Sequence, residues 1–248
     1  MAATATDPRV FHRQLPQAAS VLAVVAHPDD ESFGLGAVLA AFVDAGSAVA
    51  GVCLTHGEAS TLGDQQSDLG RVRAEELAEA ARALGIGEVR LFDHPDGALA
   101  DLPVSERAGL VVAAARSHHA DLLVAFDDTG ITGHADHRQA TRAALEAAER
   151  LDLSVLAWTI PETETATLNA EYATSFVGRP SDEIDLDIVV GRDRQFAAIA
   201  CHASQSTDNP VLWRRLALAD RRERLRWLRR AGPAHTSKEG ALPRTSLS

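Results

Sequence analysis

A histidine and three acidic residues follow the first apolar segment of the chain, in the run AHPDDES at 26–32. Asp29, Asp30 and Glu31 would repel one another at neutral pH unless a cation lay among them. His27 and Asp30 lie about one turn apart, so both side chains can face one ion. Imidazole and carboxylate together suit Zn²⁺ or a similar divalent metal, which leaves Asp29 free for another task. The run therefore predicts a metal site.

A second polar cluster follows the fourth apolar segment, in the sequence GHADH that contains His134, Asp136 and His137. His137 can complete a set of two histidines and one carboxylate with His27 and Asp30. Such a set leaves coordination positions open for water and substrate, which marks a catalytic zinc site, although Fe²⁺ also fits these ligands. Asp136 is placed to orient one of the neighbouring imidazoles.

Each cluster also has a simpler interpretation. The first could be a solvated acidic turn that caps a helix beginning near Phe33, and the second could be a helix start with exposed histidines. Gly34 and Gly36 suggest a dinucleotide-binding loop. That interpretation fails because Leu39 occupies the third glycine position and the preceding acids would repel a pyrophosphate. The metal interpretation is favoured because both clusters fall at predicted strand ends on the same edge of one sheet.

The elements that position these clusters are read from short aliphatic runs between longer segments of helical period. This alternation predicts an α/β fold, a Rossmann-like three-layer α/β/α arrangement with a mostly parallel sheet and the site at the carboxyl ends of its strands. A sixth run at 183–190 alternates polar and apolar residues, which predicts an edge strand. The five aliphatic runs lie at 20–26, 48–55, 88–92, 121–126 and 154–160.

Helices are predicted in the segments between and after these strands. The last of them, at 211–231, is dense in arginine, and we expect an amphipathic helix docked on its own domain rather than an oligomer contact. One domain over 1–230 and a polar, disordered tail at 231–248 are expected. The other predicted helices lie at 34–45, 71–84, 105–118, 137–151 and 193–204.

Composition narrows the class of protein. A hydrophobic fraction of 46% with only 4% aromatic residues predicts a core of Ala, Val and Leu, and a net charge of −11 disfavours binding to nucleic acid or anionic membrane. The chain shows no signal peptide and no apolar run long enough to span a membrane, so we expect a cytoplasmic protein. Cys53 and Cys201 are expected to be free thiols.

Five motifs together resemble the PIG-L or LmbE-like family of zinc-dependent N-deacetylases, which act on N-acetylglucosaminyl-inositol-type and related amino sugars. HPDD and HxDH in this order are the specific part of the pattern. The motifs span most of the chain and are AHPDDE at 26–31, RAEEL at 73–77, HPDG at 94–97, GHADH at 133–137 and CHASQ at 201–205.

The resemblance implies a role for each residue of the two polar clusters. It implies that His27, Asp30 and His137 bind zinc. It further implies that Asp29 is the general base and that His134 stabilises the oxyanion or donates a proton. The family's usual HPDH is here HADH, a change that leaves the ligand beside it in place.

The resemblance also implies that Arg73 and Asp96 face the substrate. Two simpler interpretations remain open, namely that Arg73 pairs with Glu76 on the surface of a helix and that Asp96 belongs to an ordinary P-D-G turn. Some sugar-processing members have a tyrosine where this chain has Thr132, so their substrate preference does not transfer.

The predicted function is removal of an N-acetyl or other N-acyl group from an amino-sugar-like small molecule, giving a free amine and acetate. In this scheme Asp136 helps to hold His134 in its charged form. Two alternatives remain: an amidase that acts on a thiol conjugate or another small amide, and a non-catalytic sugar-binding module. Homo-oligomers are compatible with the sequence, and His56 and His202 carry no predicted role.

Overall fold

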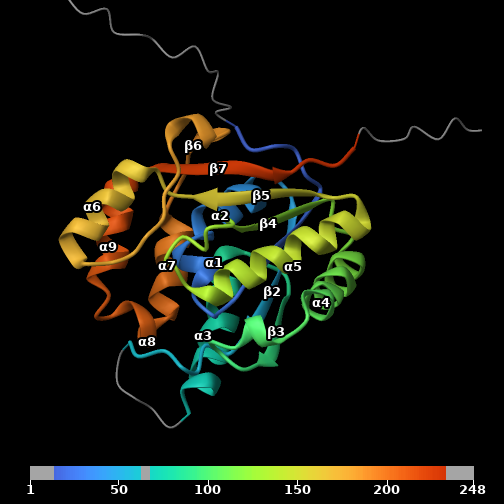
Figure 1. Ribbon diagram of the computed structural model, residues 1–248, viewed down its shortest axis with the longest axis horizontal. Helices are drawn as coiled ribbons and strands as arrows, with labels where there is room; N and C mark the ends of the chain where they lie inside the picture. Colours follow the sequence, from blue (N-terminus) through green and yellow to red (C-terminus); the bar gives the residue numbers. More distant parts are fainter. Residues whose placement is uncertain (1–13, 63–67, 233–248) are drawn as a thin grey trace, which may run out of the picture.

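The computed structural model describes residues 14–62 and 68–232, and its centre is one seven-stranded sheet (Figure 1). The order of the strands across the sheet is β3-β2-β1-β4-β5-β7-β6. All six predicted strands are present, within a few residues of the expected ends. The strands are β1 (Ser20–Val25), β2 (Ala48–Thr55), β3 (Val89–His94), β4 (Leu122–Phe126), β5 (Ser154–Thr159), β6 (Leu186–Val189) and β7 (Arg222–Arg229).

The first five strands run parallel, and the chain order reverses between β1 and β4. Val21 of β1 pairs with Val49 on one side and with Leu122 on the other. In open parallel sheets the crevice at such a reversal, beyond the carboxyl ends of the strands, is where ligands bind. The predicted metal residues follow β1 and β4, so the topology brings them to that crevice.

Helices cover both faces of the sheet, which confirms the three-layer α/β/α fold class (Figure 1). Helices α1, α2, α3 and α7 pack on one face and α4 and α5 on the other, whereas α6 and α9 pack against each other beside β5 and β7. The helices are α1 (Asp30–Phe33), α2 (Gly36–Asp44), α3 (Leu69–Leu84), α4 (Val104–His118), α5 (Ala135–Leu151), α6 (Glu162–Tyr172), α7 (Asp193–Cys201), α8 (Ala203–Ser206) and α9 (Pro210–Ala219).

Period-two alternation in the strands divides the core into two layers. In β1, Val21 and Val25 join the cluster under α2 and α3, while Leu22 and Val24 join the cluster under α4 and α5. The second cluster contains many alanines of α5, whose small side chains let the helix lie close to the sheet. The core is aliphatic, as the low aromatic content predicts.

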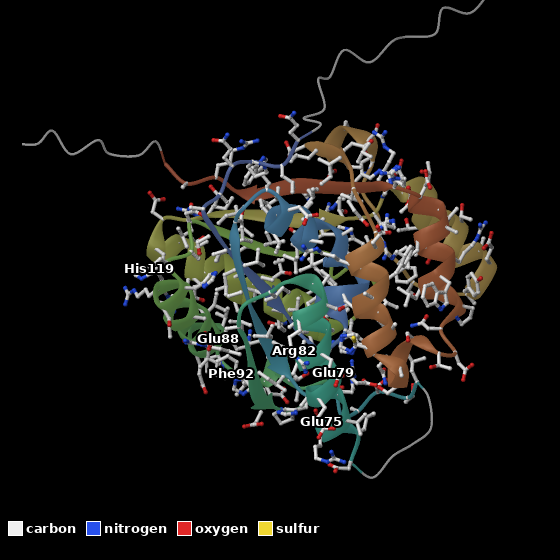
Figure 2. All side chains as sticks on the ribbon, turned by 180° about the vertical axis from the view of Figure 1, so that it is seen from behind. Glu75, Glu79, Arg82, Glu88, Phe92 and His119 are labelled. Atoms are coloured by element: carbon white, nitrogen blue, oxygen red, sulfur yellow. The ribbon has the colours of Figure 1, made fainter. Side chains whose placement is uncertain are left out.

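Helix α3 shows why one charged residue belongs to the site. Its outer face carries Glu75, Glu79 and Arg82, which point away from the body in Figure 2, and its inner face buries Leu77. Arg73 lies on the inner face and is 3% exposed. A buried arginine needs acceptors, and those acceptors come from the loops that follow β1 and β2.

The prediction of one helix over 211–231 is wrong. Helix α9 ends at Ala219, the backbone turns at Asp220 with φ of 51°, and the chain continues as β7. Strand β7 lies antiparallel between β5 and β6 and forms backbone ladders with both. A helix here would leave the edges of those two strands unpaired, so the tertiary pairing overrides the local helical propensity.

The arginines of β7 explain how a run so rich in positive charge lies inside a sheet. Arg222 and Arg224 are two residues apart and share one side of the strand, where Arg224 reaches Glu164 at 2.9 Å and Arg222 reaches Asp187 at 2.6 Å. Each arginine therefore has an acidic partner on an adjacent element. Strand β6 lies at the edge of the sheet, as its alternating pattern predicts.

The remaining expectations concern the ends and the loops. Residues 161–182, for which no element was predicted, contain helix α6. The expected tail at 231–248 lies outside the described residues from 233 onwards, while the amide of Ala231 donates to the Ser154 hydroxyl at 2.9 Å. Cys53 and Cys201 are free thiols, as expected. No helix within 14–62 and 68–232 is long and apolar enough to cross a membrane.

Candidate metal centre

The loop after β1 turns sharply at Asp29. This residue has φ of 108°, a region that residues with a side chain seldom adopt, and it is the N-cap of the short helix α1. The carbonyl of Asp29 accepts hydrogen bonds from the amides of Ser32 and Phe33, at 3.0 and 2.6 Å. Such backbone strain persists where the surrounding structure holds it, and it is frequent at functional sites.

Asp30 lies between two imidazoles. Its Oδ1 is 3.2 Å from His137 Nε2 and its Oδ2 is 3.7 Å from His27 Nδ1. The same Oδ2 accepts the amides of Ala26 and His27, at 3.1 and 3.0 Å, which fixes the carboxylate. Burial opposes ionisation, but His137 and His27 outweigh it and hold the pKa of Asp30 well below its usual range. Asp30 is therefore a buried carboxylate, available to a cation.

His137 is the third residue of α5, and its ring is oriented by the loop that precedes the helix. The Nδ1 atom lies 3.0 Å from the Gly130 carbonyl and 3.1 Å from the Thr132 hydroxyl. Since a carbonyl can only accept, Nδ1 carries a proton, and the ring is turned so that Nε2 faces Asp30. Sequence reasoning found His137 and missed both orienting partners.

His27 is surrounded by carboxylates. Its Nε2 lies 3.0 Å from Asp96 Oδ1 and 3.6 Å from Asp136 Oδ2. Burial lowers the pKa of His27, but Asp136, Asp96 and Asp30 together raise it to about 10. Nevertheless, among the described residues this buried nitrogen has no partner in good hydrogen-bond geometry.

The imidazole and carboxylate groups of this cluster are suitable ligands for a divalent metal ion. Potential ligand atoms of His27, His134 and His137 all lie within 4.8 Å of one another, and so do those of His27, Asp96 and Asp136. A metal ion could take the place of the proton among these carboxylates and give the buried His27 Nε2 a partner. Both groups include His27, and Asp30 of the predicted set lies beside His27 and His137.

Asp29 faces the cavity next to this cluster and is held by Arg73. Arg73 Nη2 lies 2.9 Å from Asp29 Oδ2, and the guanidinium also donates to the carbonyls of Pro28 and Gly57. Burial raises the pKa of Asp29 to about 6, against the opposing effect of Arg73. A carboxylate with this pKa can accept a proton near neutral pH.

Arg73 therefore binds the loop that carries the site. It lines the cavity, but its three acceptors belong to this chain, and the alternative pairing with Glu76 does not occur because Glu76 binds Ser204 instead. This contact could not be read from helical spacing, because the loop after β1 is more than forty residues away in sequence.

Asp96 is both part of a turn and part of the site. Gly97, with φ of 83°, supplies the turn that P-D-G predicts. The side chain of Asp96 points to His27, accepts the Ala59 amide at 3.1 Å and lines the cavity. Burial opposes its ionisation, but its contact with His27 keeps the pKa of Asp96 below its usual range.

The structure differs from the expected relation between His134 and Asp136. The Asp136 carboxylate accepts the amides of Gly97 and Leu99, at 2.7 and 3.2 Å, and its nearest imidazole is that of His27. Burial and the neighbouring His27 lower the pKa of His134, so His134 is not held in the charged form. Its Nδ1 accepts the Asp136 amide at 3.2 Å, which leaves the proton of the neutral ring on Nε2.

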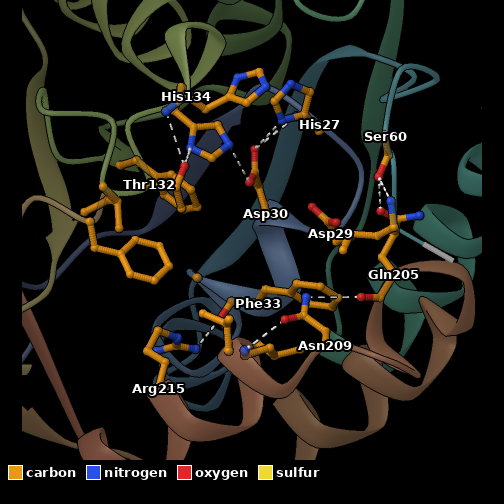
Figure 3. A pocket seen from close by; sticks show the side chains of 18 of the residues that line it. His27, Asp29, Asp30, Phe33, Ser60, Thr132, His134, Gln205, Asn209 and Arg215 are labelled. Carbon is orange, nitrogen blue, oxygen red and sulfur yellow. Dashed lines mark hydrogen bonds and ion pairs between the residues drawn. The ribbon is translucent and has the colours of Figure 1, made fainter. Parts of the chain in front are cut away.

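A cavity of about 430 Å³ opens beside these residues (Figure 3). One side is polar and carries the clusters from β1 and β4, and the other is apolar. Sequence reasoning missed the apolar side, because its residues come from distant elements and carry no motif. The apolar side includes Phe33, Phe126, Ile131, Trp158, Ile160, Phe176 and Leu212.

Two further histidines lie near the site. His202 is fully buried, and its Nε2 is 2.7 Å from Glu31 Oε1, so it ties the start of α8 to α1. The other carboxylate oxygen of Glu31 accepts the amide of Asp29 at 2.9 Å. His56 pairs with the exposed Asp93 at 2.7 Å. His202 therefore supports the loop of Asp29 from behind.

The fold and the site define a Rossmann-like α/β protein with a buried histidine and carboxylate cluster at the carboxyl ends of its strands. Residues 22–148 match the PIG-L family, described as GlcNAc-PI de-N-acetylase, and the chain belongs to this family. The motifs that carry the resemblance in the sequence therefore identify the family correctly.

Relatives with assigned names are similar to this chain over different lengths. A 1D-myo-inositol 2-acetamido-2-deoxy-alpha-D-glucopyranoside deacetylase of Streptomyces avermitilis is 35% identical over 154 residues, which cover 52% of each chain. The protein of that name in Salinispora arenicola is 31% identical over 240 residues, which cover 78% of each. The match thus spans about half the length of the first relative and more of the second.

Solved structures of low sequence identity share the fold. N,N'-diacetylchitobiose deacetylase from Pyrococcus horikoshii superposes with a TM-score of 0.61 at 22% identity, over 85% of this chain and 84% of that one. GalB, the 4-carboxy-2-hydroxymuconate hydratase of Pseudomonas putida, gives 0.66 at 19% identity, over 92% and 98%. Since one neighbour is a hydratase, the fold alone does not define the reaction.

Proposed function

We propose that this protein is a zinc-dependent hydrolase that removes the N-acetyl group of an amino-sugar-like small molecule and releases a free amine and acetate. The observation that carries the proposal is the approach of His27 and His137 to the carboxylate of Asp30, with Asp29 beside them at the cavity. The names of the inositol-glycoside deacetylases among the relatives support it.

In this proposal His27, Asp30 and His137 hold the metal. Two imidazoles and one carboxylate leave room for water and substrate, and the same set would accept Fe²⁺. Zinc, when bound, lowers the pKa of a water molecule and polarises the amide carbonyl. Asp136 and Asp96 would then orient the ring of His27 through their contacts with it.

Asp29 is the proposed general base. It lies at the cavity next to Asp30, and its raised pKa of about 6 lets it accept the proton of the attacking water at neutral pH. Arg73 keeps the carboxylate in place through the contact at 2.9 Å. Having taken the proton, Asp29 can return it to the departing nitrogen, which is a poor leaving group without it.

His134 is the proposed donor to the oxyanion. Its exposed ring lies at the cavity, with a centroid 4.6 Å from that of His27. As the neutral tautomer protonated on Nε2, it can donate a hydrogen bond to the carbonyl oxygen as negative charge develops there. The sequence suggested a charged His134 in this role, whereas we now propose that the neutral His134 ring donates the hydrogen bond.

The proposed substrate is a small-molecule amide, an N-acetylated amino sugar or its glycoside, processed in the cytoplasm by one domain over 1–230. Arg73 contributes by fixing Asp29, and Asp96 by facing the bound sugar from the cavity wall. Nucleic acid and membrane insertion have no part in the proposal, and homo-oligomers are compatible with it.

Elemental analysis combined with a free-amine assay tests this function. The purified protein should contain one equivalent of zinc and should release amine and acetate from N-acetylglucosamine or from its inositol or malate glycosides. Zinc without amine release from any of these would refute the amino-sugar deacetylase. A protein that binds no zinc and no iron would refute the metal site itself.

A further inference from the structure

Arg215 of α9 lies at the apolar side of the cavity with 6% of its surface exposed (Figure 3). One terminal nitrogen donates to the carbonyl of Phe33, and the guanidinium carbon lies 5.1 Å from the centroid of the Trp158 ring. A guanidinium has five N–H donors, so most of them lack a protein acceptor. Within 14–62 and 68–232, no carboxylate forms an ion pair with it.

Two other buried arginines show how this chain treats a guanidinium whose role is structural. Arg192 binds Glu223 at 2.6 Å and Gln195 at 2.5 Å, and Arg73 binds Asp29 at 2.9 Å. Each has a carboxylate within direct contact and further acceptors besides. Arg215 differs from both because its guanidinium lines the cavity with a single protein acceptor, the Phe33 carbonyl, and no carboxylate partner among the described residues.

The surroundings of Arg215 favour an anion in the cavity. Burial lowers its pKa, which means that the charged guanidinium is held at a cost that the more distant Glu223 and Glu164 offset only in part. A carboxylate or phosphate would satisfy the unpaired donors with short, charge-assisted hydrogen bonds.

The cavity wall between Arg215 and the metal residues is apolar. Phe33 and Trp158 lie next to Arg215, and Phe126 contacts both Trp158 and His137, with ring centroids 5.2 and 5.0 Å apart. A ligand that reached from Asp30 to Arg215 would therefore cross an aromatic surface before it met the positive charge.

We propose that Arg215 binds an anionic group of the substrate, a carboxylate or a phosphate, at the end of the cavity away from Asp30. The aromatic wall packs against the part of the same molecule that joins this group to the sugar. This inference rests on the proposed function, and it narrows the substrate class to anionic N-acyl amino-sugar derivatives. Arg215 is thus a specificity residue.

Three matched glycosides of N-acetylglucosamine test the proposal with the zinc-loaded protein. One has a neutral alkyl aglycone, one the same chain ending in a carboxylate, and one the same chain ending in a phosphate. We expect kcat/KM to be about 10- to 100-fold higher for at least one anionic glycoside than for the neutral one, mainly through KM. Equal values of kcat/KM for all three glycosides would overturn the proposal. The difference between the two anionic glycosides shows whether Arg215 binds a carboxylate or a phosphate more tightly.

Arg215→Gln should remove this advantage, so kcat/KM should fall about 10- to 100-fold for the anionic glycoside and much less for the neutral one. Arg215→Lys should keep part of it, because lysine retains the charge without the planar fork. Arg214→Gln is the matched control: it removes the same charge from the same helix, but Arg214 binds the surface residue Glu171. Equal loss on the charged and neutral glycosides in Arg215→Gln would assign Arg215 a structural role and overturn the proposal.

Calorimetric binding of the three glycosides separates this inference from the proposed function. If no glycoside releases amine, deacetylation is refuted, yet tighter binding of an anionic glycoside by the wild type than by Arg215→Gln would still support Arg215. Binding that does not depend on charge or on Arg215 would overturn the inference even if amine is released. Should Arg215→Gln fail to fold, the comparison of Arg215→Lys with wild type decides by the same criteria.

Discussion

The two parts of the molecule contribute different things to one cavity. The part from β1 through α5 carries the metal cluster, the base and the oxyanion donor, and the family match at 22–148 lies within it. The part from β5 to β7 supplies Trp158, Phe176, Leu212 and Arg215 of the opposite wall. The difference teaches that the segments up to α5 position the chemistry, whereas β5, the loop after α6 and helix α9 line the wall that shapes what enters.

The largest expected effect is the loss of amine release when the metal ligand or the base in the first part is replaced. Asp30→Ala should remove zinc and reduce amine release to background, because it deletes the carboxylate between His27 and His137. Asp29→Asn should retain zinc and lose about 10²- to 10⁴-fold in kcat, the usual contribution of a general base. Zinc content after dialysis and the rate of amine release measure both effects.

Asp93→Asn is the control for these two variants. Asp93 lies at the same edge of the sheet on β3, but its side chain is 94% exposed and pairs with His56. It should change neither zinc content nor kcat. Equal zinc loss in Asp29→Asn and Asp30→Ala would show that the division between base and ligand is wrong.

A smaller loss is expected from Arg73→Met, which leaves the buried carboxylate of Asp29 without its partner. Breaking such a buried pair costs about 3–5 kcal/mol in the free energy of unfolding, and kcat should fall because Asp29 is no longer held. Urea unfolding and kcat measure the two consequences. Arg71→Met, on the exposed face of the same helix, is the matched control.

A double-mutant cycle with Asp29→Asn tests whether Arg73 and Asp29 act as a pair. The double variant should be less destabilised than the sum of the two single variants, because each single variant leaves one buried partner unpaired and the double variant leaves neither. Strict additivity would mean that Arg73 stabilises the loop through the carbonyls of Pro28 and Gly57 alone.

The contrast between the two parts also explains what the sequence could predict. In the first part, the aliphatic runs of β1, β2 and β4 are buried on both faces and identify these strands, and polar residues directly after them fall at one sheet edge. His27, Asp30 and His137 therefore come together as expected. The local pattern needed no knowledge of distant contacts.

In the second part the local sequence pattern predicted the wrong element. The run from Arg221 to Arg230 has the composition of a helix, and only the unpaired edges of β5 and β6 make it a strand. In the first part, too, the hydrogen bonds that the Asp136 carboxylate accepts from the amides of Gly97 and Leu99 could not be predicted, because they join segments far apart in the chain. Tertiary contacts decided both cases.

A moderate effect confined to substrate binding should follow from Phe176→Ala in the second part. Phe176 lines the cavity, and its backbone is fixed by the side chain of Asn169 at 2.8 and 2.9 Å. Loss of the half-buried ring should raise KM about 10-fold while zinc content and kcat stay unchanged. Kinetics on an N-acetylglucosamine glycoside measure the effect, and loss of zinc in this variant would contradict the division between the two parts.

The smallest expected effect is on the pH dependence of stability, through the contact that joins the two parts behind Asp29. Burial lowers the pKa of His202, but the facing acids Glu31, Asp29 and Glu76 outweigh it and raise that pKa above its ordinary 6.5. The stability that His202 contributes is therefore complete below about pH 6.5 and is lost as the pH rises through the raised pKa.

Urea unfolding over a pH series should therefore show that His202→Gln loses more stability relative to wild type at low pH than at high pH. His119→Gln, at an exposed turn on the far side of the sheet (Figure 2), controls for the titration of a surface histidine and should follow the wild-type profile. A His202→Gln profile parallel to wild type at every pH would mean that the charged pair with Glu31 does not link the two parts.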